Sequence, residues 1–336
     1  MAGIRGKMTA NHSKKLIAMI LVLGALLLAV FLVPRLTDRD EPETRQDAGS
    51  SFTLDRRTYN GKTYVERTGV TPIVLMGVDR TGQTPAQTGY RSGGQADFIM
   101  IIVIDSSDKT VSMLHVDRDT MAEIVTLGIL GKEVGTRTAQ ICLSHAYGAD
   151  QMANGLHTLQ SLSNLFEGVA LDKFFSMNMD AMPVLNDVLG GVTVTMPDDY
   201  TELDPAFTKG ATVTLTGQQA YDFVRVRRDV GDQTNASRME RQRLYMQAAQ
   251  KTIEARFRAS DKGFVDALYE RLGDDLTTNV TRGQLINDAF KAARYEISPI
   301  ETLKGEHKVG ATGHMEFYAE SESIVEWVLK TFYKTP

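Results

Sequence analysis

Six arginines stand close together within residues 221–243 of a chain whose formal net charge is −5. They occupy positions 225, 227, 228, 238, 241 and 243. The planar guanidinium of arginine donates two parallel hydrogen bonds to phosphate or carboxylate oxygens, whereas lysine acts as a point charge. On an extended segment, Arg225 and Arg227 share one face, while Val224 and Val226 share the other. This arrangement predicts the floor of an anion-binding site.

From Ala236 onward the pattern of polar and apolar residues turns helical. Arg238, Arg241 and Gln242 are then three and four residues apart, on neighbouring turns of one helix. Two interpretations of this face stay open. It is either a solvated basic surface, which explains many arginine runs, or a continuation of the preceding anion site.

Three short apolar runs predict neighbouring strands in the first half of the chain. They cover residues 72–78, 98–104 and 110–115, and a polar turn at 106–109 makes the last two antiparallel neighbours. If the first strand runs parallel to the third, the ends of these two strands lie at the same sheet edge. The start of the second strand lies at that edge as well.

Acidic residues and an arginine stand at the strand ends that this edge brings together. Asp79 follows the first strand, Asp97 opens the second, and Arg118 and Asp119 follow the third. Such a set suits a divalent cation beside a phosphate, because Mg²⁺ commonly takes one or two protein carboxylates and completes its shell with water and phosphate oxygens. The alternative is that these charged residues simply cap strand ends.

The amino terminus carries the pattern of a membrane anchor. Residues 16–33 form an uninterrupted apolar run of 18 residues, long enough as a helix to cross roughly 27 Å of bilayer. Basic residues precede this run without an acid, so the positive-inside rule places residues 1–15 in the cytoplasm and the remainder outside the cell membrane. No small-residue cleavage site follows, which favours a retained single-pass signal anchor over a cleaved signal peptide.

Composition restricts what the rest of the chain can do. The 37 Lys and Arg against 42 Asp and Glu argue against nucleic acid as a partner, because its backbone requires a broad basic surface. The single cysteine, Cys142, excludes an intramolecular disulfide, and its apolar neighbours indicate an ordinary buried thiol. Residues 34–63 are polar and predict an extracytoplasmic spacer with little structure of its own, before an ectodomain at 64–336.

Helical patterns alternate with the strands without an obvious break, which favours one ectodomain over two. Helices are expected at residues 138–165, 180–189, 216–222, 236–258, 262–271, 281–295 and 321–333, with further strands at 192–196 and 314–318. His115, His145 and His157 have no metal-ligand spacing and are interpreted as structural. The predicted fold class is α/β, with a central mixed sheet that is partly antiparallel and flanked by helices.

Taken in order, the motifs of residues 71–245 resemble the LytR–CpsA–Psr family of bacterial cell-envelope proteins. The matching motifs, in the family's order, are Gly77-Val-Asp-Arg80, Asp97, Asp117-Arg-Asp-Thr120, Leu189-Gly-Gly-Val192, Leu215-Thr-Gly-Gln-Gln-Ala220, Val224-Arg-Val-Arg227 and Arg238-x-x-Arg-Gln242. Each motif is short, but the ordered set is specific.

This resemblance implies a phosphotransferase of a Gram-positive envelope. Such an enzyme moves a glycopolymer, for example teichoic acid or capsule, from a polyprenyl-pyrophosphate carrier to peptidoglycan. Carried over by motif, Asp79 and Asp97 would bind Mg²⁺. The implied pyrophosphate-binding residues are Arg118, Arg225, Arg227, Arg238 and Gln242. The candidate catalytic residues are Arg118, Asp119 and Asp232.

The chain departs from the family pattern at three positions. Gln95 stands where the family usually has an arginine, and Arg91 is the nearest substitute. Asp117 stands where a proline is common, and Asn235 stands where the family has an acid.

The missing acid leaves two alternatives to a transferase open. If that acid is a general base, Asp232 or Asp229 would have to reach into the site. Without one, the chain would be a noncatalytic envelope protein that binds polyprenyl phosphate and has a regulatory role. A hydrolase that uses water to release the carrier from the same lipid is the other alternative.

Overall fold

The computed structural model describes residues 55–80, 94–128, 132–226, 230, 234–258, 271, 273–281, 284, 288, 292 and 295–336. In this part of the chain no helix is long and apolar enough to cross a membrane. The anchor expected at residues 16–33 lies outside the described residues, as do most of the helices expected at 262–271 and 281–295.

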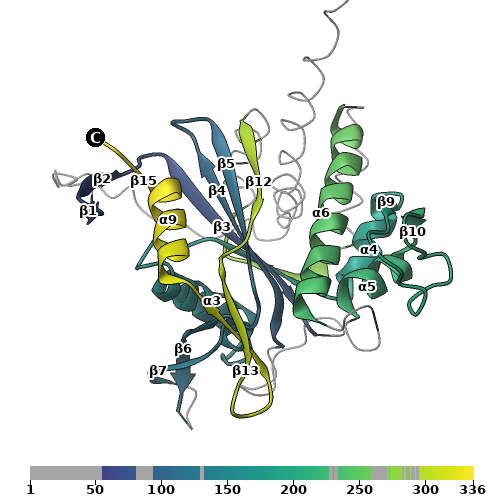
Figure 1. Cartoon of the computed structure of the whole chain (residues 1–336), viewed down its shortest axis with the longest axis horizontal. Helices are drawn as coiled ribbons and strands as arrows, with labels where there is room; N and C mark the ends of the chain where they lie inside the picture. Colours follow the sequence, from purple (N-terminus) through teal and green to yellow (C-terminus); the bar gives the residue numbers. More distant parts are fainter. Residues whose placement is uncertain are drawn as a thin grey trace, which may run out of the picture.

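A six-stranded mixed sheet forms the centre of the molecule (Figure 1). Its strands lie in the order β11 (Leu276–Thr278), β8 (Phe174–Asn178), β3 (Val70–Val78), β4 (Ala96–Asp105), β5 (Thr110–Val116) and β12 (Glu296–Glu301). β4 pairs antiparallel with both β3 and β5, so β3 and β5 run in the same direction. β8 pairs parallel with β3, and β12 pairs parallel with β5. The predicted mixed sheet is confirmed.

The central strands are apolar on both faces because both faces are covered. Alternate residues of β4 divide between two cores: Ile99 and Ile101 pack on one side of the sheet, while Met100 and Ile102 pack on the other. The first core is completed by side chains of α3 (Gln151–Leu165) and α9 (Ser321–Phe332). The second includes side chains of β11 and α6 (Asn235–Arg258).

A second packed unit, called here the α4–α6 lobe, stands beside the sheet (Figure 1). It comprises α4 (Ala181–Val188), β9 (Val192–Thr195), β10 (Thr212–Leu215), α5 (Gly217–Arg225) and α6. Phe207, Phe223 and Tyr245 are almost fully buried in its own core. α5 begins at a capping box, in which Thr216 and Gln219 bond reciprocally to each other's backbone N–H groups. The helices expected at 180–189, 216–222 and 321–333 are thus confirmed as α4, α5 and α9.

Outside residues 221–243, two expectations for local structure are wrong. Residues 56–63, which end the spacer predicted to have little structure, instead belong to the hairpin of β1 (Arg56–Tyr59) and β2 (Lys62–Glu66), and β2 pairs with β15 (Tyr333–Lys334). Its turn residues Asn60 and Gly61 have φ angles of 48° and 73°, and an Asn-Gly pair is a strong hairpin signal. Within the range 138–165, expected to be helical, residues 138–140 instead end β7 (Glu133–Gln140), the partner of β6 (Met121–Leu127). A short 3-10 helix follows at Ile141–His145, and the α-helix begins only at Gln151.

Candidate active site

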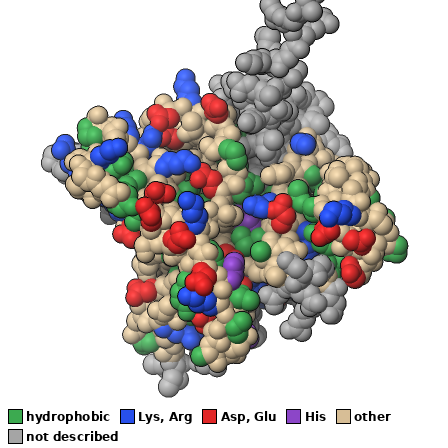
Figure 2. Space-filling model, in the orientation of Figure 1, with side chains coloured by type: hydrophobic (Ala, Val, Ile, Leu, Met, Phe, Trp, Pro, Cys, Tyr) green, Lys and Arg blue, Asp and Glu red, His purple; other side chains and the backbone are tan. Residues whose placement is uncertain are grey.

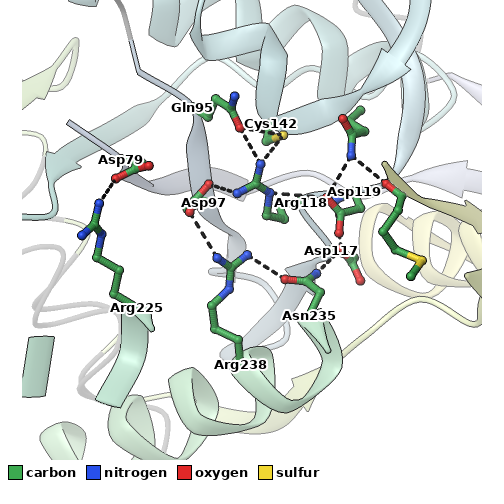
Figure 3. Close-up of polar contacts among 12 residues, drawn as sticks. Asp79, Gln95, Asp97, Asp117, Arg118, Asp119, Cys142, Arg225, Asn235 and Arg238 are labelled. Carbon is green, nitrogen blue, oxygen red and sulfur yellow. Dashed lines mark hydrogen bonds and ion pairs between the residues drawn. The ribbon is translucent and has the colours of Figure 1, made fainter. Parts of the chain in front are cut away.

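The sheet edge where β3 ends, β4 begins and β5 ends carries the predicted acids and arginine (Figure 3). The backbone N–H of Asp79 donates to the carbonyl of Gln95 over 2.8 Å, which fixes the end of β3 beside the start of β4. Asp97 lies in β4, and Arg118 follows β5. The pairing of these strands therefore brings together the three segments that the sequence placed at one edge.

Arg118 lies at the centre of this edge and is largely buried. Its guanidinium donates to the side-chain oxygens of Asp97 and Gln95 (Figure 3). Its Nη2 lies 3.3 Å from the Sγ of Cys142, and its Nε lies 3.4 Å from Oδ1 of Asp119. Burial opposes the charge, but interactions with Cys142, Asp97 and Asp119 outweigh it and raise the pKa of this guanidinium. Arg118 is therefore a permanent cation.

Cys142 is buried, as predicted, but it touches the site. Burial raises the pKa of its thiol to about 12, although Arg118 acts in the opposite direction. The thiol is consequently neutral at pH 7. The carboxylates that pair with Arg118 are those of Asp97 and Asp119.

Asp97 also binds an arginine of the α4–α6 lobe. Nη1 of Arg238 lies 3.2 Å from Oδ2 of Asp97, and its Nη2 lies 2.7 Å from Oδ1 of Asn235. Arg238 is only 5% exposed, so the interpretation of a solvated basic helix face is wrong for this residue. One carboxylate thus joins two arginines, the largely buried Arg118 of the sheet edge and the buried Arg238 of α6.

Arg241 and Gln242 are buried as well, but they contact the end of α5. Arg241 donates to the carbonyls of Phe223, over 2.6 Å, and Val226, and Nε2 of Gln242 donates to the carbonyl of Val224 over 3.2 Å. Carbonyls at the C-terminal end of a helix have no partner within the helix. These two side chains therefore support the site indirectly, by fixing the helix end that carries an accessible arginine of the site.

Arg225 is that accessible arginine. It is the last residue of α5, so the extended geometry predicted for it is wrong; extended backbone begins only at Val226. Its Nη2 lies 2.7 Å from Oδ1 of Asp79, and the two side chains are 38% and 42% exposed. The hydrogen bond with Asp79 raises the pKa of Arg225. A ligand in solution can reach this pair without any rearrangement of the cores.

Two side chains that the sequence analysis did not propose as functional complete the charged network. Oδ1 of Asp117 accepts from Nδ2 of Asn235 over 2.6 Å, and its Oδ2 lies 2.8 Å from Nε2 of His307. No local pattern marks His307, because 190 positions separate it from Asp117. Asp119, a predicted catalytic residue, is buried and accepts from Gln140 over 3.1 Å. The proposed site residues that lie outside the described part of the chain are Arg227 and Asp232, together with Arg91 and Asp229.

Two carboxylates at this edge could hold a divalent cation together with a phosphate ligand. Within the described residues no group of three or more His, Cys, Asp or Glu side chains could hold a metal ion. Asp79 and Asp97 offer two carboxylates, and both already accept hydrogen bonds from arginines. Two carboxylates suffice for Mg²⁺ when water and substrate phosphate oxygens complete its shell.

Solved structures share the fold of this chain. Protein gbs0355 from Streptococcus agalactiae aligns with a TM-score of 0.62 and 22% identity, over 79% of this chain and 88% of its own. TagV from B. subtilis aligns with a TM-score of 0.58 and 20% identity, over 79% and 96%. TagT bound to LI-WTA aligns with a TM-score of 0.57 and 19% identity, over 79% and 90%. At these identities the likeness concerns the fold alone.

The match to a family model identifies the family, and named sequence relatives accompany it. The polyisoprenyl-teichoic acid–peptidoglycan teichoic acid transferase TagU of Bacillus licheniformis is 28% identical over 237 residues, 70% of this chain and 68% of TagU. The relative of the same name from Halalkalibacterium halodurans is 27% identical over 208 residues, 62% of this chain and only 60% of that protein. The model of the LytR_cpsA_psr family matches residues 36–331. The chain therefore belongs to the LytR_cpsA_psr family.

Proposed function

We propose that the chain is a membrane-anchored phosphotransferase that moves a glycopolymer from a polyprenyl-pyrophosphate carrier to peptidoglycan. The observation that carries this proposal is the convergence of Arg118, Arg225 and Arg238 on the carboxylates of Asp79 and Asp97. The relatives named TagU support the substrate class, since their name states transfer of polyisoprenyl-linked teichoic acid to peptidoglycan.

The chemistry is a displacement at phosphorus. A hydroxyl of peptidoglycan attacks the phosphorus that carries the glycan, a new P–O bond forms, and the bond to polyprenyl phosphate breaks. Such a transfer depends on positioning and charge neutralisation more than on a protein nucleophile. Arg225 is accessible to the pyrophosphate, and buried Arg118 is already held in place by Asp97. Mg²⁺ bound with the pyrophosphate at Asp79 and Asp97 would add positive charge at the leaving group.

The proposed location is the outer face of the cell membrane, with the amino terminus in the cytoplasm. The apolar run at residues 16–33 and the basic residues before it support this orientation. An anchor also suits the proposed donor, because a polyprenyl lipid is confined to the membrane.

A protein that only binds polyprenyl phosphate is the main alternative, and the amide of Asn235 is its motivation. Nδ2 of that amide lies 2.6 Å from Oδ1 of Asp117, a buried carboxylate. An acid is therefore present beside Asn235, although not at residue 235 itself. This contact favours transfer over binding alone.

A transfer assay tests the proposal. The full-length chain in liposomes would receive a short-chain polyprenyl-pyrophosphoryl disaccharide, peptidoglycan oligomers and Mg²⁺, with and without a chelator. We expect a metal-dependent phosphodiester product, and a loss of about 10²–10³-fold in kcat for Arg118→Ala, because the variant lacks a preorganised cation. Arg56→Ala, an exposed arginine of β1, is the matched control.

Each alternative has its own result in this assay. Capture of the donor without any product under every metal condition would identify a binding protein. Release of free polymer phosphate would identify a hydrolase.

A further inference from the structure

Asp117 differs from the other described acids of the candidate active site in its partner. Asp79, Asp97 and Asp119 each pair with an arginine. Asp117 instead pairs with an imidazole, at 2.8 Å between its Oδ2 and Nε2 of His307. Arginine keeps its proton at physiological pH, whereas imidazole exchanges its own. Among these described pairs, Asp117–His307 is therefore the one that can take up a proton during a reaction.

Asp117 is fixed firmly enough to orient that imidazole. The residue is 6% exposed, and its Oδ1 accepts from Nδ2 of Asn235 over 2.6 Å and from the backbone N–H of Asp119 over 2.9 Å. Oδ2 is left for His307. When Nε2–H donates to this oxygen, Nδ1 becomes the ring nitrogen with the free lone pair. A carboxylate in this position also stabilises the imidazolium that forms on protonation.

His307 lies at the accessible end of the pair, on β13 (Gly305–Val309), with its side chain 36% exposed. Its ring packs 4.7 Å, centre to centre, from that of Phe317 on β14 (Met315–Ala319). The N–H of Phe317 donates to the carbonyl of Asp119 over 2.8 Å, which attaches this hairpin to the loop that carries Arg118. Figure 2 shows histidine side chains at the surface along the boundary between the sheet and the α4–α6 lobe.

The buried histidines are poor alternatives for proton transfer. His115 and His145 are 1% and 0% exposed. Burial, together with the charges of Arg243 and Arg238, lowers the pKa of His115 to about 3. A substrate hydroxyl has no direct route to either ring.

A continuous path of hydrogen bonds joins His307 to the arginines of the site. From Asp117 it passes to Asn235 over 2.6 Å, from Asn235 to Arg238 over 2.7 Å, and from Arg238 to Asp97 over 3.2 Å. Figure 3 shows these last four side chains side by side. The position of the imidazole is thus tied to the groups that would hold the pyrophosphate.

We propose that His307 is a further catalytic residue, the base that takes the proton of the acceptor hydroxyl, and that Asp117 positions it. This inference rests on the proposed transferase function. As the hydroxyl oxygen bonds to the phosphorus that carries the glycan, its proton moves to Nδ1 of His307. The bond from that phosphorus to the bridging oxygen breaks, and its electron pair leaves with polyprenyl phosphate. Asp117 balances the charge of the imidazolium.

The test compares His307→Ala with His307→Gln in the full-length chain and the transfer assay. Glutamine retains a donor for Asp117 but does not accept the proton, so both variants are expected to lose about 10²–10⁴-fold in kcat. The Kd for geranylgeranyl pyrophosphate is expected to stay unchanged, because His307 does not hold the pyrophosphate. Imidazole added to the solution is expected to restore part of the transfer by His307→Ala.

The matched control is His314→Ala, an exposed histidine between β13 and β14 that should leave transfer at the unaltered rate. Full transfer by His307→Gln would show a merely structural contact and would overturn the proposal. A loss in His307→Ala that imidazole does not relieve would overturn it as well. Failure of the transferase function is distinct, since the unaltered chain itself would then form no phosphodiester to peptidoglycan.

Discussion

The sheet edge and the α4–α6 lobe contribute different kinds of side chain to one site. The described acids Asp79 and Asp97 come from the edge, together with Arg118, whereas the lobe supplies the cations Arg225 and Arg238. The two regions have largely separate apolar cores. The site is therefore assembled at a boundary, where ion pairs between the regions decide how the charges face each other.

The two ion pairs that join described residues across this boundary differ in how deeply they are buried. The side chains of Arg238 and Asp97 are 6% and 10% exposed, but those of Arg225 and Asp79 are 38% and 42% exposed. An exposed pair contributes about 0–1 kcal/mol to stability, whereas removal of one partner from a buried pair costs about 3–5 kcal/mol. The buried pair, Arg238–Asp97, therefore holds the lobe against the sheet edge, whereas the exposed pair, Arg225–Asp79, is available to a ligand.

The largest expected effect on stability is that of Asp97→Ala. The substitution removes the carboxylate shared by buried Arg238 and largely buried Arg118, so the free energy of unfolding should fall by about 3–5 kcal/mol. Urea unfolding of the variant measures this fall. A loss below about 1 kcal/mol would contradict the distinction between the two pairs.

Arg241→Met tests whether α6 fixes the end of α5. The variant leaves the carbonyls of Phe223 and Val226 without these hydrogen bonds, which should cost about 1–3 kcal/mol, chiefly at Phe223, the buried one of the two. The KM for the donor should also rise, because Arg225 loses its fixed position. Arg243→Met on the same helix is the control, since Arg243 pairs with Glu240 near the surface and should change stability by less than about 1 kcal/mol.

Cys142, which is buried beside the sheet edge, predicts that the stability of the fold depends on pH. Its pKa is raised by burial to about 12 from a reference value of 9.0, so the unfolded chain releases this proton at a lower pH than the folded chain. The resulting stability is fully present below pH 9.0 and is lost as the pH rises toward about 12. Cys142→Ala should therefore lose less stability than the unaltered chain between neutral and alkaline pH. Urea unfolding of both chains at pH 7 and at alkaline pH measures this difference. An equal fall in the free energy of unfolding for the variant and the unaltered chain would contradict the prediction.

The smallest expected effect on stability is that of Asp79→Asn. Its pair with Arg225 is exposed, so the free energy of unfolding should change by less than about 1 kcal/mol. Transfer should nevertheless require more Mg²⁺, because one of the two carboxylates that fit the cation is gone. The Mg²⁺ concentration at half-maximal rate measures this; an unchanged value would remove Asp79 from the proposed metal site.

The sequence by itself determined the three strands whose ends carry the sheet-edge residues of the site. Apolar runs predicted β3, β4 and β5, and the polar turn between β4 and β5 placed Asp97 and Arg118 at one edge, because a tight turn leaves few alternatives to antiparallel pairing. The start of α5 was also predictable from the sequence, because Thr216 and Gln219 form hydrogen bonds within the first turn of the helix.

Only the tertiary structure decided what each charged side chain does. Arg238 and Arg241 are neighbours on one helix, yet one binds Asp97 and the other binds backbone carbonyls of α5. The packing of the lobe sets these partners. Arg238 and Asp97, for example, are 141 positions apart in the sequence. The Asp117–His307 pair spans 190 positions. A local pattern specifies contacts between residues close in the chain, but such distant partners meet only when separate cores have packed together.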